Sequence, residues 1–455
     1  MRLWRVFLIG LGTSIAALDT AVNIAFPAIT RAFDLPLPAI QWIVVAYVLT
    51  YASFMLAVGR VGDLVNHGIV FRLGLAWSAA ALVLCAAAPS YPVLVAARIA
   101  QGIGAAAVLG CGPALLTSLY AEGERARALA LYTMMLSIGV AAGPIVGGVL
   151  IEAWGWPAVF WFRAPIALAT ALLLPALPRP LAGLAARRSF DLPGALFLAA
   201  ALIGLLLSLN RLRYVADGDV SALLFAGVAV AALAAFIRRE RRARDPLIDL
   251  APFRSFPFSF ANSGSVLVNL ASFTVFLLVP YYLARMTGLP DAMSGVVLAV
   301  SGAGTVLGSP IGALLVRRAG TRPVATAGAA LAALGLALIA IAAPGHDLRR
   351  LVVGIALQGT GLGLFQVAYM DLVMGSIAPS ARGVAGSLAM LTRTLGVVAG
   401  ATTLTLVYGF ANAAAADGSE AFLAGFRFTF WVAAALPAAV AGIDIVRSLA
   451  SVKGR

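Results

Sequence analysis

The chain has 455 residues, of which 62% are hydrophobic and only 11% are charged, and its mean hydropathy is +1.00. Soluble proteins contain about 25% charged residues, so this composition excludes most soluble classes and indicates a polytopic membrane protein. The formal net charge of +14 would also suit a nucleic-acid-binding protein, so the positions of the charges must decide between the two classes.

Apolar windows recur along the whole chain, and each is long enough to cross a hydrocarbon core of about 30 Å as a helix. The sequence predicts fourteen of them, at residues 4–27, 41–61, 71–88, 93–119, 128–150, 156–177, 193–209, 220–237, 256–283, 293–316, 323–343, 351–375, 384–409 and 428–446. We expect the first window to be retained as a helix, because a secretory signal is shorter and ends in a small-residue cleavage site.

The basic residues are unevenly distributed between the two sides of the predicted helices. If the N-terminus lies inside, most of the 32 Lys and Arg residues fall in inner loops, whereas the 18 acidic residues divide evenly. This distribution follows the positive-inside rule, and the basic run at 238–244 is typical of an anchor at anionic headgroups. We therefore expect a multi-pass protein of the plasma (inner) membrane, with both termini cytoplasmic and no nucleic-acid partner.

The first window contains an acidic residue, Asp19, within an apolar stretch. The small residues Gly12 and Ala16 precede it on the same helical face, and Asn23 follows it on that face. An ionised carboxylate at this depth costs about 2.5 to 3.5 kcal/mol or more on insertion scales, so it must face a cavity or a partner.

Two arginines, Arg98 in the fourth window and Arg163 in the sixth, lie at a similar depth. Both are about 9 Å from the predicted outer helix ends and Asp19 is about 12 Å from its own, which predicts one charged layer. Because arginine does not release its proton, we expect Asp19 to carry the coupled proton with Arg98 as its partner. The alternative is a static buried ion pair that fixes helix packing.

Other polar residues inside the windows are candidates for a central substrate cavity. Together with Arg163 they are Asn23, Gln101, Asn269, Gln358, Gln366 and Tyr369. Each could equally form a hydrogen bond between helices.

Several residues are candidates for a conformational switch. Gly139, Gly143, Pro144, Gly147 and Gly148 form a motif in the fifth window that permits close helix approach and removes one backbone hydrogen bond.

Two charged pairs could also take part in switching. Asp371 and Arg393 lie roughly 12 and 15 Å from the inner helix ends, where they could form a lock, although Asp371 could instead cap a bent helix end. Asp63, with Arg60 before it, lies after the second window and is expected to cap or bridge helices.

The remaining motifs carry no enzyme signature. Cys85 and Cys111 lie inside predicted helices, where we expect buried thiols outside any disulfide. No metal-ligand spacing, Ser-His-Asp arrangement, Walker loop or dinucleotide fingerprint occurs. We therefore expect no metal, no cofactor and no enzyme activity.

The two halves of the chain resemble each other. Residues 101–104 recur at 358–361, and residues 139–143 recur at 396–400 with the same offset. The repeat predicts an all-α fold of two six-helix bundles, residues 1–178 and 255–455, joined by a segment at 179–254 with two inserted helices. Arg98 and Pro144 have no counterpart, since Ile355 and Ala401 take their places, so the polar chemistry is concentrated in the first half.

The chain is similar to the major facilitator superfamily, and within it to the fourteen-helix branch of drug:proton antiporters. The resemblance rests on residues 18–27, 59–71, 98–104, 139–148 and 190–194, and on Arg393. It implies that Asp19 acts in proton coupling and that the bend at Pro144 keeps the fifth helix shaped for antiport. Two features depart from the family: residues 64–68 lack the usual basic residues, so only Arg60 and Arg72 supply charge there, and Arg163 replaces an asparagine.

The resulting hypothesis is a monomeric, proton-coupled exporter of an amphipathic compound, acting in multidrug or metabolite efflux by alternating access. Its partners would be a small-molecule substrate, protons and the lipid bilayer. The excess of arginine over acid disfavours multiply cationic drugs and favours a neutral or anionic cargo. An importer or facilitator of a small organic anion is one alternative, and a membrane sensor or scaffold that moves no solute is another.

Overall fold

The computed structural model describes residues 2–117, 119, 125–174, 191–212, 219–242, 251–343, 347–376, 382–413 and 418–453. These residues form helices and short connections, and none of them lies in a strand. The predicted all-α class is therefore confirmed. The chain divides into two compact units, Met1–Leu247 and Ile248–Arg455.

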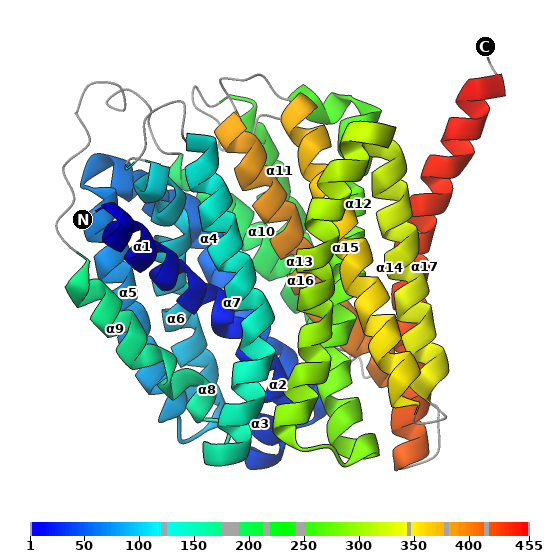
Figure 1. Ribbon diagram of the computed structural model, residues 1–455, viewed down its shortest axis with the longest axis horizontal. Helices are drawn as coiled ribbons and strands as arrows, with labels where there is room; N and C mark the ends of the chain where they lie inside the picture. Colours follow the sequence, from blue (N-terminus) through cyan, green and yellow to red (C-terminus); the bar gives the residue numbers. More distant parts are fainter. Residues whose placement is uncertain are drawn as a thin grey trace. The chain divides into compact units, whose positions relative to one another are not determined.

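The first unit contains eleven helices and two short 3-10 turns in its described part (Figure 1). The helices are α1 (Arg2–Ala17), α2 (Ala21–Ile24), α3 (Phe26–Ala32), α4 (Gln41–Leu64), α5 (His67–Ala86), α6 (Tyr91–Thr117), α7 (Arg125–Trp154), α8 (Ala158–Trp161), α9 (Arg163–Leu173), α10 (Leu192–Arg211) and α11 (Ser221–Glu240). The turns are η1 (Leu18–Thr20), between α1 and α2, and η2 (Leu37–Ile40), before α4.

The second unit consists mainly of long helices. They are α12 (Phe256–Tyr282), α13 (Asp291–Ala319), α14 (Thr321–Ala342), α15 (Leu348–Ser376), α16 (Arg382–Ala413) and α17 (Ser419–Lys453). A 3-10 turn, η5 (Ala251–Arg254), precedes α12, and a π-helical turn, η6 (Leu283–Thr287), follows it. Helices α14 and α15 pack along each other, as Figure 1 shows.

Twelve helical stretches among the described residues are long and apolar enough to cross a membrane, and they coincide with twelve predicted windows. The other two windows, 156–177 and 193–209, coincide with shorter apolar helices, Ala158–Leu173 and Pro193–Leu205. The structure therefore does not support the predicted count of fourteen. One of these helices is divided at Phe162 between α8 and α9, and the described apolar part of the other is too short.

The first predicted helix is interrupted twice (Figure 1). α1 ends at Ala17 and the chain tightens into η1, which contains Asp19, before α2 begins. A second break follows α2 because Pro27 has no backbone N–H and cannot bond to the carbonyl four residues earlier. The interruptions give residues 18–20 a backbone different from that of a continuous helix.

Glycines allow α6 to approach both of its neighbours in the first unit. A Cβ atom on Gly102 would lie 2.8 Å from the Tyr47 carbonyl oxygen on α4. One on Gly104 would lie 2.9 Å from the Gly74 carbonyl oxygen on α5. Any larger side chain would push these helices apart.

Equivalent glycines make equivalent contacts in the second unit. A Cβ atom on Gly359 of α15 would lie 2.1 Å from the Ser301 carbonyl oxygen on α13, and one on Gly361 would lie 2.6 Å from the Gly328 carbonyl oxygen on α14. Gly359 and Gly361 align with the two glycines of α6 in the sequence repeat. The repeated sequence therefore forms the same packing in each unit.

The inserted helices α10 and α11 pack together as a hairpin that an ion pair holds at one end. Buried Asp191 accepts hydrogen bonds from Arg239 Nε at 2.9 and 3.1 Å, and it accepts another from the Gly194 N–H at 3.2 Å. Asp191 thus also stabilises the first turn of α10. Arg239, which belongs to the basic run, has this role in addition to the predicted one of headgroup anchor.

Candidate functional site

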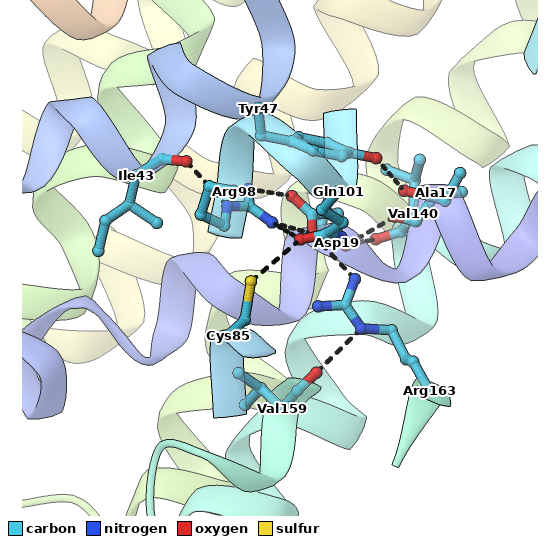
Figure 2. Close-up of polar contacts among 12 residues, drawn as sticks. Ala17, Asp19, Ile43, Tyr47, Cys85, Arg98, Gln101, Val140, Val159 and Arg163 are labelled. Carbon is cyan, nitrogen blue, oxygen red and sulfur yellow. Dashed lines mark hydrogen bonds and ion pairs between the residues drawn. The ribbon is translucent and has the colours of Figure 1, made fainter. Parts of the chain in front are cut away.

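The first unit contains a buried cluster of one carboxylate and two guanidinium groups (Figure 2). Asp19 Oδ1 and Oδ2 accept hydrogen bonds from Arg98 Nη1 and Nη2 at 2.7 and 2.6 Å, which is a bidentate ion pair. Asp19 Oδ1 also accepts from Arg163 Nη1 at 2.9 Å. The structure thus brings together the three residues predicted to form a charged layer.

Arg98 is held in place from several directions. Its Nε donates to the Ile43 carbonyl oxygen at 2.9 Å, and its Nη1 also donates to Gln101 Oε1 at 2.6 Å. The guanidinium lies 4.2 Å from the centre of the Tyr47 ring. A buried arginine with a carboxylate, an amide and an aromatic face around it retains its charge without water.

Arg163 has one unused donor inside the protein. Its side chain is 0% exposed, and its Nε donates to the Val159 carbonyl oxygen at 2.9 Å. Its Nη2 is buried and has no hydrogen-bond partner among the described residues. A buried N–H group without a partner costs about 1 to 3 kcal/mol, so the site favours an additional acceptor at this atom.

The charges at this site do not balance. Two arginines face one carboxylate, whose side chain remains 15% exposed. Gln101 Nε2 adds a weaker hydrogen bond to Asp19 Oδ1 at 3.2 Å. With Asp19 ionised the cluster therefore carries a net positive charge, and this charge would increase if Asp19 took up a proton.

The glycine and proline motif of α7 packs directly against the segment that contains Asp19. A Cβ atom on Gly139 would lie 2.8 Å from the Ser14 carbonyl oxygen, and one on Gly147 would lie 2.8 Å from the Ala21 carbonyl oxygen. Pro144 and Gly148 are buried in the same helix. The motif therefore fixes α7 against α1, η1 and α2.

A single hydroxyl connects this motif to the charged cluster. Pro144 has no N–H, so the Val140 carbonyl one turn earlier loses its helical hydrogen bond. The Thr20 hydroxyl donates to that carbonyl oxygen at 3.0 Å. A Cβ atom on Gly143 would lie 2.0 Å from Thr20 Oγ1, so Gly143 provides the space and Pro144 the acceptor.

A second polar network joins α12, α15 and α16 in the second unit. The Tyr369 hydroxyl donates to Asn262 Oδ1 at 2.9 Å and lies 2.9 Å from Thr392 Oγ1. Gln366 Nε2 donates to Asn269 Oδ1 at 3.4 Å. Three of the predicted cavity residues, Asn269, Gln366 and Tyr369, therefore belong to this network.

The other predicted cavity residues are in separate places. Gln101 and Arg163 lie at Asp19, whereas Asn23 is buried in α2. Gln358 Oε1 accepts a hydrogen bond from the Ser301 hydroxyl at 2.8 Å.

The residues predicted to form a lock are not joined in this structure. Asp371 Oδ2 accepts a hydrogen bond from the Thr321 hydroxyl at 2.6 Å, at the beginning of α14. Arg393 is half-buried on α16, and no ion pair connects it to Asp371.

Arg60 and Asp63 belong to the end of α4, and their side chains lie outside the part that the structure describes.

Cys85 and Cys111 are buried and form no disulfide, as predicted. Cys85 contacts the charged cluster, since its Sγ lies 3.8 Å from Gln101 Oε1. In the described ranges, no group of three His, Cys, Asp or Glu residues could hold a metal ion.

Sequence reasoning missed Tyr47 and Thr20 as parts of the site. Tyr47 covers the Arg98 guanidinium, and Thr20 follows Asp19 directly in the chain. The absent N–H of Pro144 could have indicated that Val140 needs a donor. No pattern in the sequence indicates that Thr20 supplies it.

Comparison with known proteins agrees with the fold and the membrane spans. Residues 7–401 and 261–446 match the family described as Major Facilitator Superfamily. The riboflavin transporter RibZ of Clostridioides difficile is 27% identical over 440 residues, covering 95% of each chain. The tetracenomycin C resistance and export protein of Streptomyces glaucescens is 30% identical, covering 89% of this chain and 75% of the relative. The solved structure of the nucleoside transporter NupG, at 13% identity, has the same fold, with a TM-score of 0.70 over 98% of this chain and 99% of that one.

Proposed function

The chain belongs to the Major Facilitator Superfamily, and from this premise we propose that it exports an amphipathic organic compound in exchange for protons. Members of this family are membrane transporters for small molecules and not enzymes. The proposal concerns the direction of transport, its coupling to protons and the class of cargo.

The observation that carries the proposal is the position of Asp19 between two buried arginines. A carboxylate is the one group of this cluster that can take up and release a proton in ordinary conditions, because arginine stays protonated. Its proton affinity depends on how closely the two guanidinium groups approach it. A conformational change that separates Asp19 from Arg98 or Arg163 would therefore change the proton occupancy of Asp19.

The proposed cycle uses this dependence. Cargo enters from the cytoplasm or inner leaflet while Asp19 releases its proton inward, and Asp19 takes up a proton from outside after the cargo has left. In the cycle α7 moves together with Asp19, because the hydrogen bond from Thr20 to the Val140 carbonyl links them. Asp63 with Arg60, and Asp371 with Arg393, would bridge helices in conformations that form during the cycle.

We further propose a neutral or anionic cargo. The cluster carries more positive than negative charge, and Arg163 Nη2 offers a donor without a partner among the described residues. A carbonyl or carboxylate oxygen would satisfy this donor, whereas a multiply cationic drug would meet repulsion. Two relatives of this chain are named for the organic compounds riboflavin and tetracenomycin C.

The topology is also part of the proposal. We place the protein in the plasma (inner) membrane as a monomer with both termini cytoplasmic, following the positive-inside rule. The short helices α8 with α9, and α10, would cross the membrane as well, giving the fourteen-helix form of the family. Residues 1–178 and 255–455 would then be the two moving bundles, with 179–254 inserted between them.

A facilitator of a small organic anion is the second candidate, and the unused donor of Arg163 favours it. Proteoliposomes distinguish the two functions. For an exporter of the proposed kind, adding cargo should cause proton movement, and accumulation of cargo against its gradient should stop when the pH gradient is collapsed. If cargo moves equally well without any proton movement, the protein is a facilitator and the proposal of proton-coupled antiport is wrong.

A further inference from the structure

A cavity of about 190 Å³ lies within the second unit, between α12, α14, α15 and α17. Its mouth is at the ends of the membrane-crossing stretches. Phe256 is the first residue of its span, Arg322 is the second residue of its span, and Arg447 is the last residue of its span. The mouth therefore lies at the level where a bilayer changes from hydrocarbon to headgroups.

The inner part of the cavity is apolar. Phe260, Ala261, Phe365 and Val440 contribute to its walls, and the lining is mostly hydrocarbon and aromatic. Gly264 lies eight residues after Phe256 on α12, so the cavity extends about 12 Å from the headgroup level toward the membrane interior. Water gains few hydrogen bonds in such a space, so an apolar chain is the better occupant.

The net charge of the side chains at the mouth is positive, with two arginines and one carboxylate. Asp444 Oδ1 accepts from Arg322 Nε at 2.7 Å, and its Oδ2 accepts from the Thr326 hydroxyl at 2.6 Å, so both oxygens of this carboxylate are occupied. Arg447 stacks on Phe256, with its guanidinium carbon 3.4 Å from the ring centre. Within the described ranges no carboxylate pairs with Arg447, so the mouth retains one uncompensated cation.

These features match an amphiphile with an anionic head. A cation at the headgroup level, above an apolar cavity of this depth, binds a phosphate group and one acyl chain at the same time. We propose that this cavity is a binding site for an anionic phospholipid. The phosphate is held by Arg447 and the adjacent Arg322, and the chain passes between Phe260 and Val440 toward Gly264.

This site is distinct from the charged cluster at Asp19, because all of its lining residues belong to the second unit. The proposed site also gives a role to an exposed aromatic side chain at the start of α12. Phe256 is 48% exposed, and its ring supports the Arg447 guanidinium and continues as a stack onto Phe260, 5.6 Å away. The stack fixes the cation above the opening of the cavity.

Native mass spectrometry of the full chain in detergent tests the site. The chain is titrated with dioleoylphosphatidylglycerol, with dioleoylphosphatidylcholine and with inorganic phosphate. The wild type should retain the anionic lipid preferentially, and inorganic phosphate should not displace it. Arg447→Gln should reduce the preference for the anionic lipid roughly three- to tenfold, the range expected for one partly exposed charge-assisted contact.

Two further variants keep the test independent of folding effects. Ala261→Phe fills the cavity and keeps the charges, so it should reduce retention of both lipids. Arg350→Gln removes an exposed arginine that pairs with Asp347 elsewhere in this unit, so it should leave retention unchanged. An equal loss of anionic-lipid retention in Arg447→Gln and Arg350→Gln would contradict the proposed site. Displacement of the lipid by inorganic phosphate alone would contradict it as well.

Discussion

The Thr20 hydroxyl donates a hydrogen bond to the backbone carbonyl oxygen of Val140 at 3.0 Å. That carbonyl is available because Pro144, four residues later, has no N–H. Thr20 directly follows Asp19, so the backbone position opened by Pro144 in α7 contacts the residue next to the ionisable group of the first span. Membrane proteins often satisfy a proline-exposed carbonyl with a neighbouring hydroxyl, and here that hydroxyl adjoins the charged cluster.

Replacing Thr20 should destabilise the protein. Thr20→Val keeps the shape of the side chain and removes the donor, which leaves the Val140 carbonyl without its partner. We expect a loss of about 1 to 3 kcal/mol in the free energy of unfolding. Thermal unfolding in detergent measures it, and Thr20→Ser is the control because it retains the hydroxyl. Equal stability of the Val and Ser variants would show that the hydrogen bond contributes nothing.

Gly143→Ala should disturb the hydrogen bond between Thr20 and Val140 by a change on α7. The added Cβ atom would lie 2.0 Å from Thr20 Oγ1, so α7 or the η1 turn must move. We expect Gly143→Ala to reduce proton-coupled transport more than stability, since helix packing can relax while the geometry at Asp19 is lost. Gly409→Ala is a suitable control, because nothing lies within 4 Å of the added atom. Unchanged transport in Gly143→Ala would show that the contact between α7 and Thr20 has no part in coupling.

The stability of the charged cluster should depend on its balance of charge. Removing one partner of a buried ion pair typically costs about 3 to 5 kcal/mol, because the remaining charge is uncompensated. Asp19→Asn leaves two arginines without a carboxylate and should lower the melting temperature. Adding Arg163→Gln restores the original net charge of the cluster and should recover part of the loss. A double-mutant cycle over Asp19 and Arg163 measures this coupling, and strictly additive effects would contradict it.

The stability of the hairpin formed by α10 and α11 should depend on the ion pair between Asp191 and Arg239. Asp191 is almost completely buried, and Arg239 is half exposed. Asp191→Ala would remove both the partner of Arg239 and the acceptor for the Gly194 N–H, so it should destabilise α10 more than Arg239→Ala does. Proteolysis of the segment around α10 in the two variants compares them. Equal protection would mean that the buried carboxylate has no structural role.

The sequence predicted a large part of the site because depth follows from counting along a helix. Asp19, Arg98 and Arg163 are far apart in the chain, yet the distance of each from its helix end indicated a common layer, and the three side chains are in contact. The glycine motif of the fifth window predicted close helix approach, and α7 packs closely against α1 at Gly139 and against α2 at Gly147.

Other features could not be predicted from the sequence. The interruption at residues 18–20 depends on how α1 packs against α7, which periodicity does not report. The Tyr47 ring over Arg98 comes from a helix whose rotation is set by its neighbours. Hydropathy detects apolar length, but the sixth predicted window forms a shorter apolar helix, Ala158–Leu173, with a break at Phe162, so it is not among the twelve described stretches long enough to span.

The central claim is that Asp19 carries the coupled proton, and Asp19→Asn tests it most directly. The measurement compares two activities of one proteoliposome preparation: cargo accumulation driven by a pH gradient, and exchange of labelled for unlabelled cargo without a gradient. We predict that the variant loses gradient-driven accumulation and retains exchange, because an amide cannot take up the proton. Gradient-driven accumulation at the wild-type level in Asp19→Asn would contradict the claim and assign the residue a structural role.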